Sequence, residues 1–167
     1  MLHLIERLLP APLHRALLPP VARVRDRWRR WRRTEITGCC VFISNSAGEL
    51  LMLRHSYGPP VWALPGGGIA KGEDPEAAAR REVFEELAMR LDEVQSLGVR
   101  DEMISNSPQK AHLFAALCDA EPKPDQREII EARFFAQDAL PEPIGRVTAE
   151  RLEVWRAAAG ASQSSES

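Results

Sequence analysis

The stretch GGGIAKGEDPEAAARREVFEELAM, Gly66 to Met89, joins three consecutive glycines to an alanine-rich segment that is dense in glutamate. Glycine adopts backbone conformations closed to other residues, so the three glycines predict a loop that can approach a phosphate or another backbone closely. Asp74 is suited to cap a helix and Pro75 to begin one. The stretch therefore predicts a loop followed by a helix that runs to about Arg90.

A helical wheel divides the predicted helix into two faces. The apolar arc consists of Ala79, Val83, Phe84, Leu87 and Leu91. On the opposite side Glu82, Glu85 and Glu86 lie within about a third of a turn, where like charges repel. One interpretation is a solvated face on which Arg81 pairs with Glu85. The other is a hard divalent cation, because Mg²⁺ and Mn²⁺ favour carboxylate oxygens.

These residues resemble the Nudix box, a pattern of glycine, glutamate, an arginine-glutamate pair, an aliphatic residue and two further glutamates at fixed spacing. The matching positions are Gly67, Glu73, Arg81, Glu82, Val83, Glu85, Glu86 and Met89. Ala88 stands where the family has glycine. The segments VWALPGG and EIIEARFF resemble strands on either side of the box, so the resemblance extends from about Thr37 to Ala159.

The resemblance implies an α/β chain with the Nudix fold, an α/β/α sandwich with a mixed β-sheet. It implies a metal-dependent pyrophosphohydrolase that acts on acid anhydrides. Such an enzyme cleaves the diphosphate linkage of a nucleoside diphosphate joined to another small molecule, releasing a nucleoside monophosphate. Two alternatives stay open: a catalytically silent Nudix domain that binds a nucleotide as a sensor, and a nucleic-acid-binding protein that acts through its arginine-rich N-terminus.

The same resemblance implies the roles of the site residues. The ligands of one or more Mg²⁺ or Mn²⁺ ions would be Glu82, Glu85, Glu86 and Gly67, the last through its backbone. Glu73 and Arg81 resemble the family's supporting pair, which orients the ligands.

The general base is not fixed by position in the family. Glu85 and Glu86 are candidates, and so are Glu128 and Glu131 of the later strand, among which we favour Glu128. The candidate catalytic group therefore consists of Glu85, Glu86, Glu128 and Arg81. Trp62 is a candidate for stacking on a nucleobase, although a tryptophan in a short apolar strand more often belongs to the core.

Composition suits one globular domain. The chain has 167 residues, of which 44% are hydrophobic and 28% charged. Besides the helix after the glycines, the pattern predicts a hairpin of residues 37–44 and 50–56, strands over 97–104, 111–120 and 128–136, and a helix over 148–159. Cys39, Cys40 and Cys118 form neither a disulfide framework nor a metal-binding spacing, so we expect a reducing cytoplasm.

The net charge of −2 conceals an uneven distribution. Residues 1–33 carry nine arginines against two acidic residues, a net charge of +7. We therefore divide the chain into a basic N-terminal extension (1–34), a Nudix domain (35–159) and a small polar tail (160–167) that we expect to be flexible. No apolar run in the N-terminal extension approaches the roughly 20 residues of a membrane-spanning helix.

The N-terminal extension has the pattern of a basic amphipathic helix. Val21, Val24, Trp28 and Trp31 share one arc, and arginines occupy most of the rest. This pattern indicates docking on an anionic membrane at its inner face, or on nucleic acid. The alternative is that the apolar arc packs on the chain's own domain or on a partner in a homodimer.

We predict that the intact protein sediments with anionic vesicles and that a chain beginning at Thr34 does not. Each arginine near an anionic bilayer contributes about 1 kcal/mol, so high salt should weaken the binding. Neutral vesicles are the control, and turnover of a soluble diphosphate should change by less than about three-fold. Unfolding of the shortened chain, or loss of a dimer, would show instead that the segment belongs to the fold.

Overall fold

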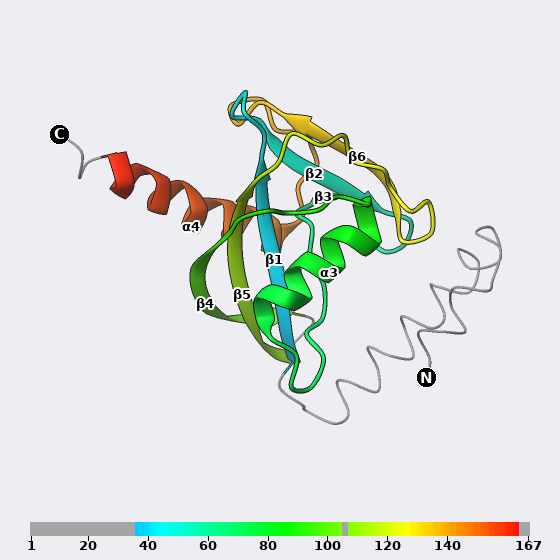
Figure 1. Cartoon of the computed structure of the whole chain (residues 1–167), viewed down its shortest axis with the longest axis vertical. Coiled ribbons are helices and arrows are strands. Elements are labelled where there is room, and N and C mark those ends of the chain that lie inside the picture. Colours follow the sequence, from blue (N-terminus) through cyan, green and yellow to red (C-terminus); the bar gives the residue numbers. More distant parts are fainter. Residues whose placement is uncertain (1–35, 105–106, 164–167) are drawn as a thin grey trace.

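The computed structural model describes residues 36–104 and 107–163, where six strands form one mixed sheet that carries two helices (Figure 1). The strands are β1 (Ile36–Ser44), β2 (Leu50–His55), β3 (Trp62–Ala63), β4 (Val94–Ile104), β5 (Ser107–Leu117) and β6 (Ile129–Phe135). The helices are α3 (Pro75–Leu87) and α4 (Arg146–Gln163). The strand order is β3-β2-β1-β5-β4, and β6 pairs with β2. Only β1 and β5 run parallel among these pairs, so the predicted mixed α/β sheet is confirmed.

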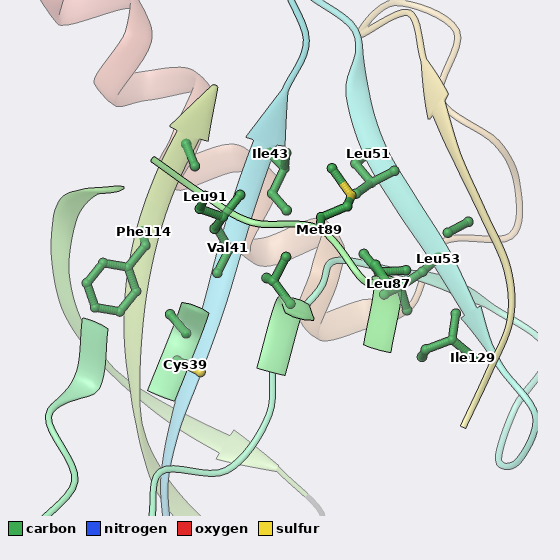
Figure 2. Packing of buried hydrophobic residues seen from close by; sticks show 14 of the residues in the cluster. Cys39, Val41, Ile43, Leu51, Leu53, Leu87, Met89, Leu91, Phe114 and Ile129 are labelled. Atoms are coloured by element: carbon green, nitrogen blue, oxygen red, sulfur yellow. The ribbon is translucent and has the colours of Figure 1, made fainter. Parts of the chain in front are cut away.

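Each face of the sheet has its own apolar core, because successive side chains of a strand point to opposite faces. On one face Val41 and Leu51 pack with Leu87 of α3, as the close view shows (Figure 2). On the other face Phe42 packs with α4, and its ring stacks on Trp155 at 5.4 Å between centroids. The two helices therefore lie on opposite faces, which gives the predicted sandwich.

The predicted hairpin of the first two strands is only partly correct. β1 and β2 pair antiparallel, with Ser44 opposite Leu50 beside the turn. Toward the start of β1, the glycine-rich loop replaces β2 as the hydrogen-bonding neighbour of the strand. The amide of Val41 donates to the carbonyl of Pro65 at 2.9 Å, and the amide of Cys39 donates to that of Gly67 at 2.9 Å. The glycine-rich loop is thus fixed against the middle of the sheet.

The main helix ends earlier than the sequence predicted. Asp74 caps its start as expected, with its carboxylate accepting from the amide of Ala77 at 2.9 Å. At the other end Ala88 adopts a left-handed conformation with φ of 54°, so the helix ends at Leu87 and not near Arg90. Alanine thus fills the left-handed position that glycine favours.

Phe84 was expected on the packed face of α3, and this is wrong. Its side chain is 46% exposed, and its ring lies 4.9 Å from the guanidinium carbon of Arg90. The contact with the sheet is centred on Ala79, Val83 and Leu87, all fully buried. Phe84 lies at the edge of the apolar arc, beyond the reach of the sheet.

The last helix is longer than expected, since α4 begins at Arg146 and continues to Gln163. Its alanine-rich end favours this extension into the predicted tail. No helix among the described residues is long and apolar enough to cross a membrane. The predicted basic helix of the N-terminal extension lies outside the described residues, and its docking partner stays a prediction.

We predict that Ala88→Gly stabilises the protein. Glycine adopts φ of 54° without the strain of a Cβ atom, so the free energy of unfolding should rise by about 0.5–1 kcal/mol. Ala77→Gly in the first turn of the same helix is the matched control and should lower it by up to about 1 kcal/mol. Both changes are measured by urea denaturation. A loss of stability in Ala88→Gly would contradict the strain at this position.

Candidate active site

Two glycines allow the loop to lie between β1 and α3. Gly66 has φ of 144°, and a Cβ atom there would fall 2.2 Å from the carbonyl oxygen of Cys39. A Cβ atom on Gly67 would fall 2.4 Å from the carboxyl carbon of Glu82. Neither position accepts a side chain. The predicted residue Gly67 thus lies in contact with the predicted ligand Glu82, and its own carbonyl accepts from Cys39.

Arg81 supplies the positive charge that the glutamates of α3 require. Its guanidinium donates two hydrogen bonds to Glu73, at 2.8 and 3.1 Å. It also donates to Glu82 at 2.9 Å and to Glu85 at 3.3 Å. The hydrogen bonds from Arg81 hold the pKa of Glu73 at about 2 and raise that of Arg81. The ion pair between Arg81 and Glu85 that the sequence suggested is present. Arg81 also joins Glu73 to Glu82.

The glutamates of α3 differ in their burial. The side chain of Glu85 is 41% exposed and that of Glu82 18%. Glu86 is buried, with 8% exposed. Among the described residues, the Glu86 side chain accepts a hydrogen bond from the amide of Gly66, at 3.3 Å. Its carboxylate is therefore buried with weak compensation, which is costly for an ionised group.

Burial and neighbouring charges make the ionised forms of these carboxylates less favourable. Burial is the main cause that raises the pKa of Glu86, and the charge of Glu82 adds to it. Burial likewise raises the pKa of Glu82, against the opposing effect of Arg81. Glu128 lies close enough to raise the pKa of both. The loop before β6 thus adds a carboxylate to those of α3.

This cluster has the donor chemistry of a site for a hard divalent cation. A buried carboxylate beside two others is stabilised when a cation neutralises their mutual repulsion, and carboxylate oxygens are the donors that Mg²⁺ and Mn²⁺ favour. The glycine loop leaves Glu82 space that a side chain would fill. In residues 36–104 and 107–163 no three His, Cys, Asp or Glu side chains are already arranged as a metal-binding group.

The two candidate bases of the later strand lie on different sides of the sheet. Glu131 lies opposite Arg54 in the ladder of β2 and β6 and pairs with it at 3.5 Å. Arg54 in turn lies 5.7 Å from the ring centre of Trp62, on the face that α4 covers. Glu128 precedes the strand and interacts with Glu82 and Glu86 on the face of α3. The structure therefore brings Glu128, and not Glu131, to the cluster.

Trp62 lies away from this cluster. The residue is 6% exposed, and its ring meets that of Phe135 edge to face at 5.0 Å. These contacts favour its role in the core. Stacking on a nucleobase would require the ring to leave its place beneath α4.

Asp125 was not among the site residues that the sequence predicted. Its carboxylate accepts from the amides of Arg127, Glu128 and Ile129, at 2.9 to 3.0 Å. The sequence signal was available, since an aspartate that follows a proline and precedes a strand commonly binds backbone amides two or three residues on. This residue holds the loop that carries Glu128.

A mixed sheet between two helices, with a glycine-rich loop packed against the glutamates of α3, defines an α/β sandwich domain. The family model of the NUDIX domain matches residues 34–155, most of the chain. The chain therefore belongs to the Nudix family, as the resemblance in its sequence implied.

Individual relatives agree with this membership. The RNA pyrophosphohydrolase of Rhodospirillum rubrum is 42% identical over 53 residues, which are 32% of this chain and 32% of that protein. The match thus spans about a third of the relative's length. The MutT NUDIX hydrolase from Burkholderia pseudomallei is 28% identical with a TM-score of 0.65, over 72% of this chain and 97% of that one.

A third similarity concerns the fold alone. The NUDIX domain of Shewanella oneidensis NrtR, whose structure was solved as a complex with ADP ribose, is 16% identical. It has a TM-score of 0.66, over 74% of this chain and 88% of that chain.

We predict that Glu86→Gln stabilises the protein when a chelator is present. The amide keeps the shape of the side chain and removes a charge that burial disfavours, so the free energy of unfolding should rise by about 1 kcal/mol or more at neutral pH. Glu85→Gln on the exposed side of α3 is the control and should change it by less than about 0.5 kcal/mol. Thermal and urea denaturation test this. An unfolding free energy below that of the unaltered protein would contradict an uncompensated charge at Glu86.

Proposed function

We propose that this chain is a metal-dependent pyrophosphohydrolase that cleaves the diphosphate linkage of a nucleoside diphosphate derivative. The observation that supports this most is the buried carboxylate of Glu86, which lies beside Glu82 and Glu128 where a glycine loop excludes side chains. A fold that buries charge in this way loses stability, and a cation with a bound diphosphate restores it.

Glu82 and Glu86 would hold Mg²⁺ or Mn²⁺, with Glu85 at the exposed side of the helix. When bound, the cation neutralises charge on the diphosphate and lowers the pKa of a water molecule. Arg81 fixes Glu82 from one side, and Glu73 fixes Arg81 through two hydrogen bonds. The ligand oxygens are therefore oriented before the substrate binds.

Glu128 is our candidate for the general base. Its charge raises the pKa of both Glu82 and Glu86, and it belongs to a different segment of the chain. Its carboxylate would accept the proton of the attacking water as the oxygen–phosphorus bond forms and the diphosphate bond breaks. The products would be a nucleoside monophosphate and the phosphorylated remainder of the substrate.

The substrates to be compared share a diphosphate: nucleoside triphosphates, dinucleoside polyphosphates, nucleotide sugars, ADP-ribose and capped RNA ends. The name of the similar relative, RNA pyrophosphohydrolase, supports the inclusion of RNA. Each is incubated with the full chain and Mg²⁺ or Mn²⁺, and released nucleotide and phosphate are measured. The three cysteines are free thiols, so we expect the enzyme to work in the reducing cytoplasm.

A second candidate function is a silent nucleotide-binding domain. The complete set of glutamates on α3 favours the enzyme, because binding alone does not require a cation site that destabilises the fold. Binding of the same compounds without any turnover, with either cation, would favour the silent domain.

We predict that hydrolysis requires a divalent cation and that Glu86→Gln and Glu128→Gln each lower kcat by about 10²-fold or more. Glu131→Gln, three residues after Glu128 and within β6, is the matched control. It should retain kcat within about three-fold, because its side chain lies on the opposite face of the sheet. Full activity in chelator, or unchanged turnover in both Glu86→Gln and Glu128→Gln, would refute the proposed mechanism.

A further inference from the structure

The loop between β5 and β6 is tied to the end of α3 by its backbone. The amide of Lys123 donates to the carbonyl of Leu87 at 2.8 Å, and the amide of Asp125 donates to that of Glu86 at 3.0 Å. These carbonyls belong to the last turn of the helix, where no further helical amide can reach them. The position of the loop is therefore set by the same residue, Glu86, that carries the buried carboxylate.

The side chain of Asp125 then organises the residues that follow. One carboxylate oxygen accepts from the amides of Arg127 at 3.0 Å, Glu128 at 3.0 Å and Ile129 at 2.9 Å, and the other lies 3.3 Å from the Glu128 amide. The turn is closed by the amide of Gln126, which donates to the carbonyl of Ile129 at 3.0 Å. Charge-assisted bonds of this kind are stronger than neutral ones.

The turn also contains a strained residue. Gln126 has φ of 60°, a left-handed conformation that non-glycine residues adopt infrequently. Such a conformation persists when the surrounding contacts determine it. The hydrogen bonds of Asp125 begin at the next residue, so the aspartate compensates for the strain of the turn it caps.

The other side of the Glu128 backbone is held by Ser56, the residue that follows β2. The amide of Ser56 donates to the carbonyl of Glu128 at 2.7 Å, and the hydroxyl of Ser56 donates to the carbonyl of Arg127 at 2.6 Å. The amide of Glu128 is bound by Asp125 and its carbonyl by Ser56. Both peptide groups that flank its Cα atom are therefore fixed.

We propose that Asp125 is a positioning residue for catalysis: it fixes the backbone of Glu128 relative to Glu86, and thereby the distance between the base and the metal-binding carboxylates. This inference rests on the proposed function and on Glu128 as its base. The Asp125 carboxylate accepts three amides of one turn, and its charge also raises the pKa of Glu86, so Asp125→Asn, which keeps the acceptor and removes the charge, separates the two effects. A displacement of about 1 Å at such a group can cost up to 10²-fold in rate.

The test is a double-mutant cycle in the full chain with Mg²⁺, using the compound of the screen that is hydrolysed fastest. Asp125→Ala should lower kcat by about 10-fold or more while KM changes less than about two-fold, because the base acts in the chemical step. Asp125→Asn keeps an oxygen acceptor and should retain kcat within about three-fold. In a chain that already carries Glu128→Gln, Asp125→Ala should have no further effect on kcat, because it acts through Glu128.

A matched control lies at the start of the loop between β5 and β6. Asp119 accepts from the amide of Ser46, in the turn between β1 and β2, at 2.7 Å, so Asp119→Ala removes a carboxylate-to-amide bond from the opposite end of the loop to Glu128. It should leave kcat unchanged. Amide hydrogen exchange provides a readout independent of substrate: Arg127 to Ile129 should exchange faster in Asp125→Ala and not in Asp119→Ala. Should the alanine variant fail to fold, Asp125→Ser replaces it in the same cycle.

Two results would overturn the positioning role. One is unchanged kcat in Asp125→Ala; the other is an equal loss on the Glu128→Gln background, which would indicate a structural effect that does not pass through the base. Failure of the proposed function gives a different result: the unaltered chain would hydrolyse no diphosphate. The hydrogen-exchange measurement would still report whether Asp125 fixes the turn.

Discussion

The close approach of the glycine loop to β1 and α3 is the constraint on which the site depends. At Gly66 and Gly67 the neighbouring backbone and carboxylate occupy the space of a Cβ atom. The loop can lie there because β1 and β2 separate after their turn and leave the amides of Cys39 and Val41 to the loop. Any side chain at these glycines would push the loop away from Glu82 and open the site.

The charges of α3 follow from this approach. With the loop against the helix, Glu86 is shielded from water and its carboxylate becomes costly, whereas Glu85 stays exposed. Arg81 offsets the repulsion on one side only, since it binds Glu73 and Glu82. The remaining charge lies beside Glu86. Such a group lowers stability at this point, which is consistent with the cation site that we propose.

The C-terminal end of α3 contributes to the site, as its glutamate-bearing face does. Because the helix stops at Ala88, the carbonyls of Glu86 and Leu87 are available to the loop that leads to β6. A helix continued to Arg90 would use those carbonyls internally. The early termination thus connects the helix that carries Glu82 and Glu86 to the segment with Glu128, and the two sources of carboxylate share one backbone framework.

The sequence by itself determined the features that depend on local spacing. Residues within about one helix length determine the cap at Asp74 and the family of the chain. They also determine that Val83 and Leu87 lie on a different face from the glutamates, because helical periodicity fixes their relative positions. The mixed sheet of the sandwich was predicted from the same resemblance. Tertiary structure alone decided what depends on strand register. Glu131 lies within β6 opposite Arg54, whereas Glu128 lies before the strand, where its amide is bound by Asp125 and its carbonyl by Ser56. Register is set by contacts between segments distant in sequence, and so is the exposure of Phe84, which depends on where the sheet ends beneath the helix.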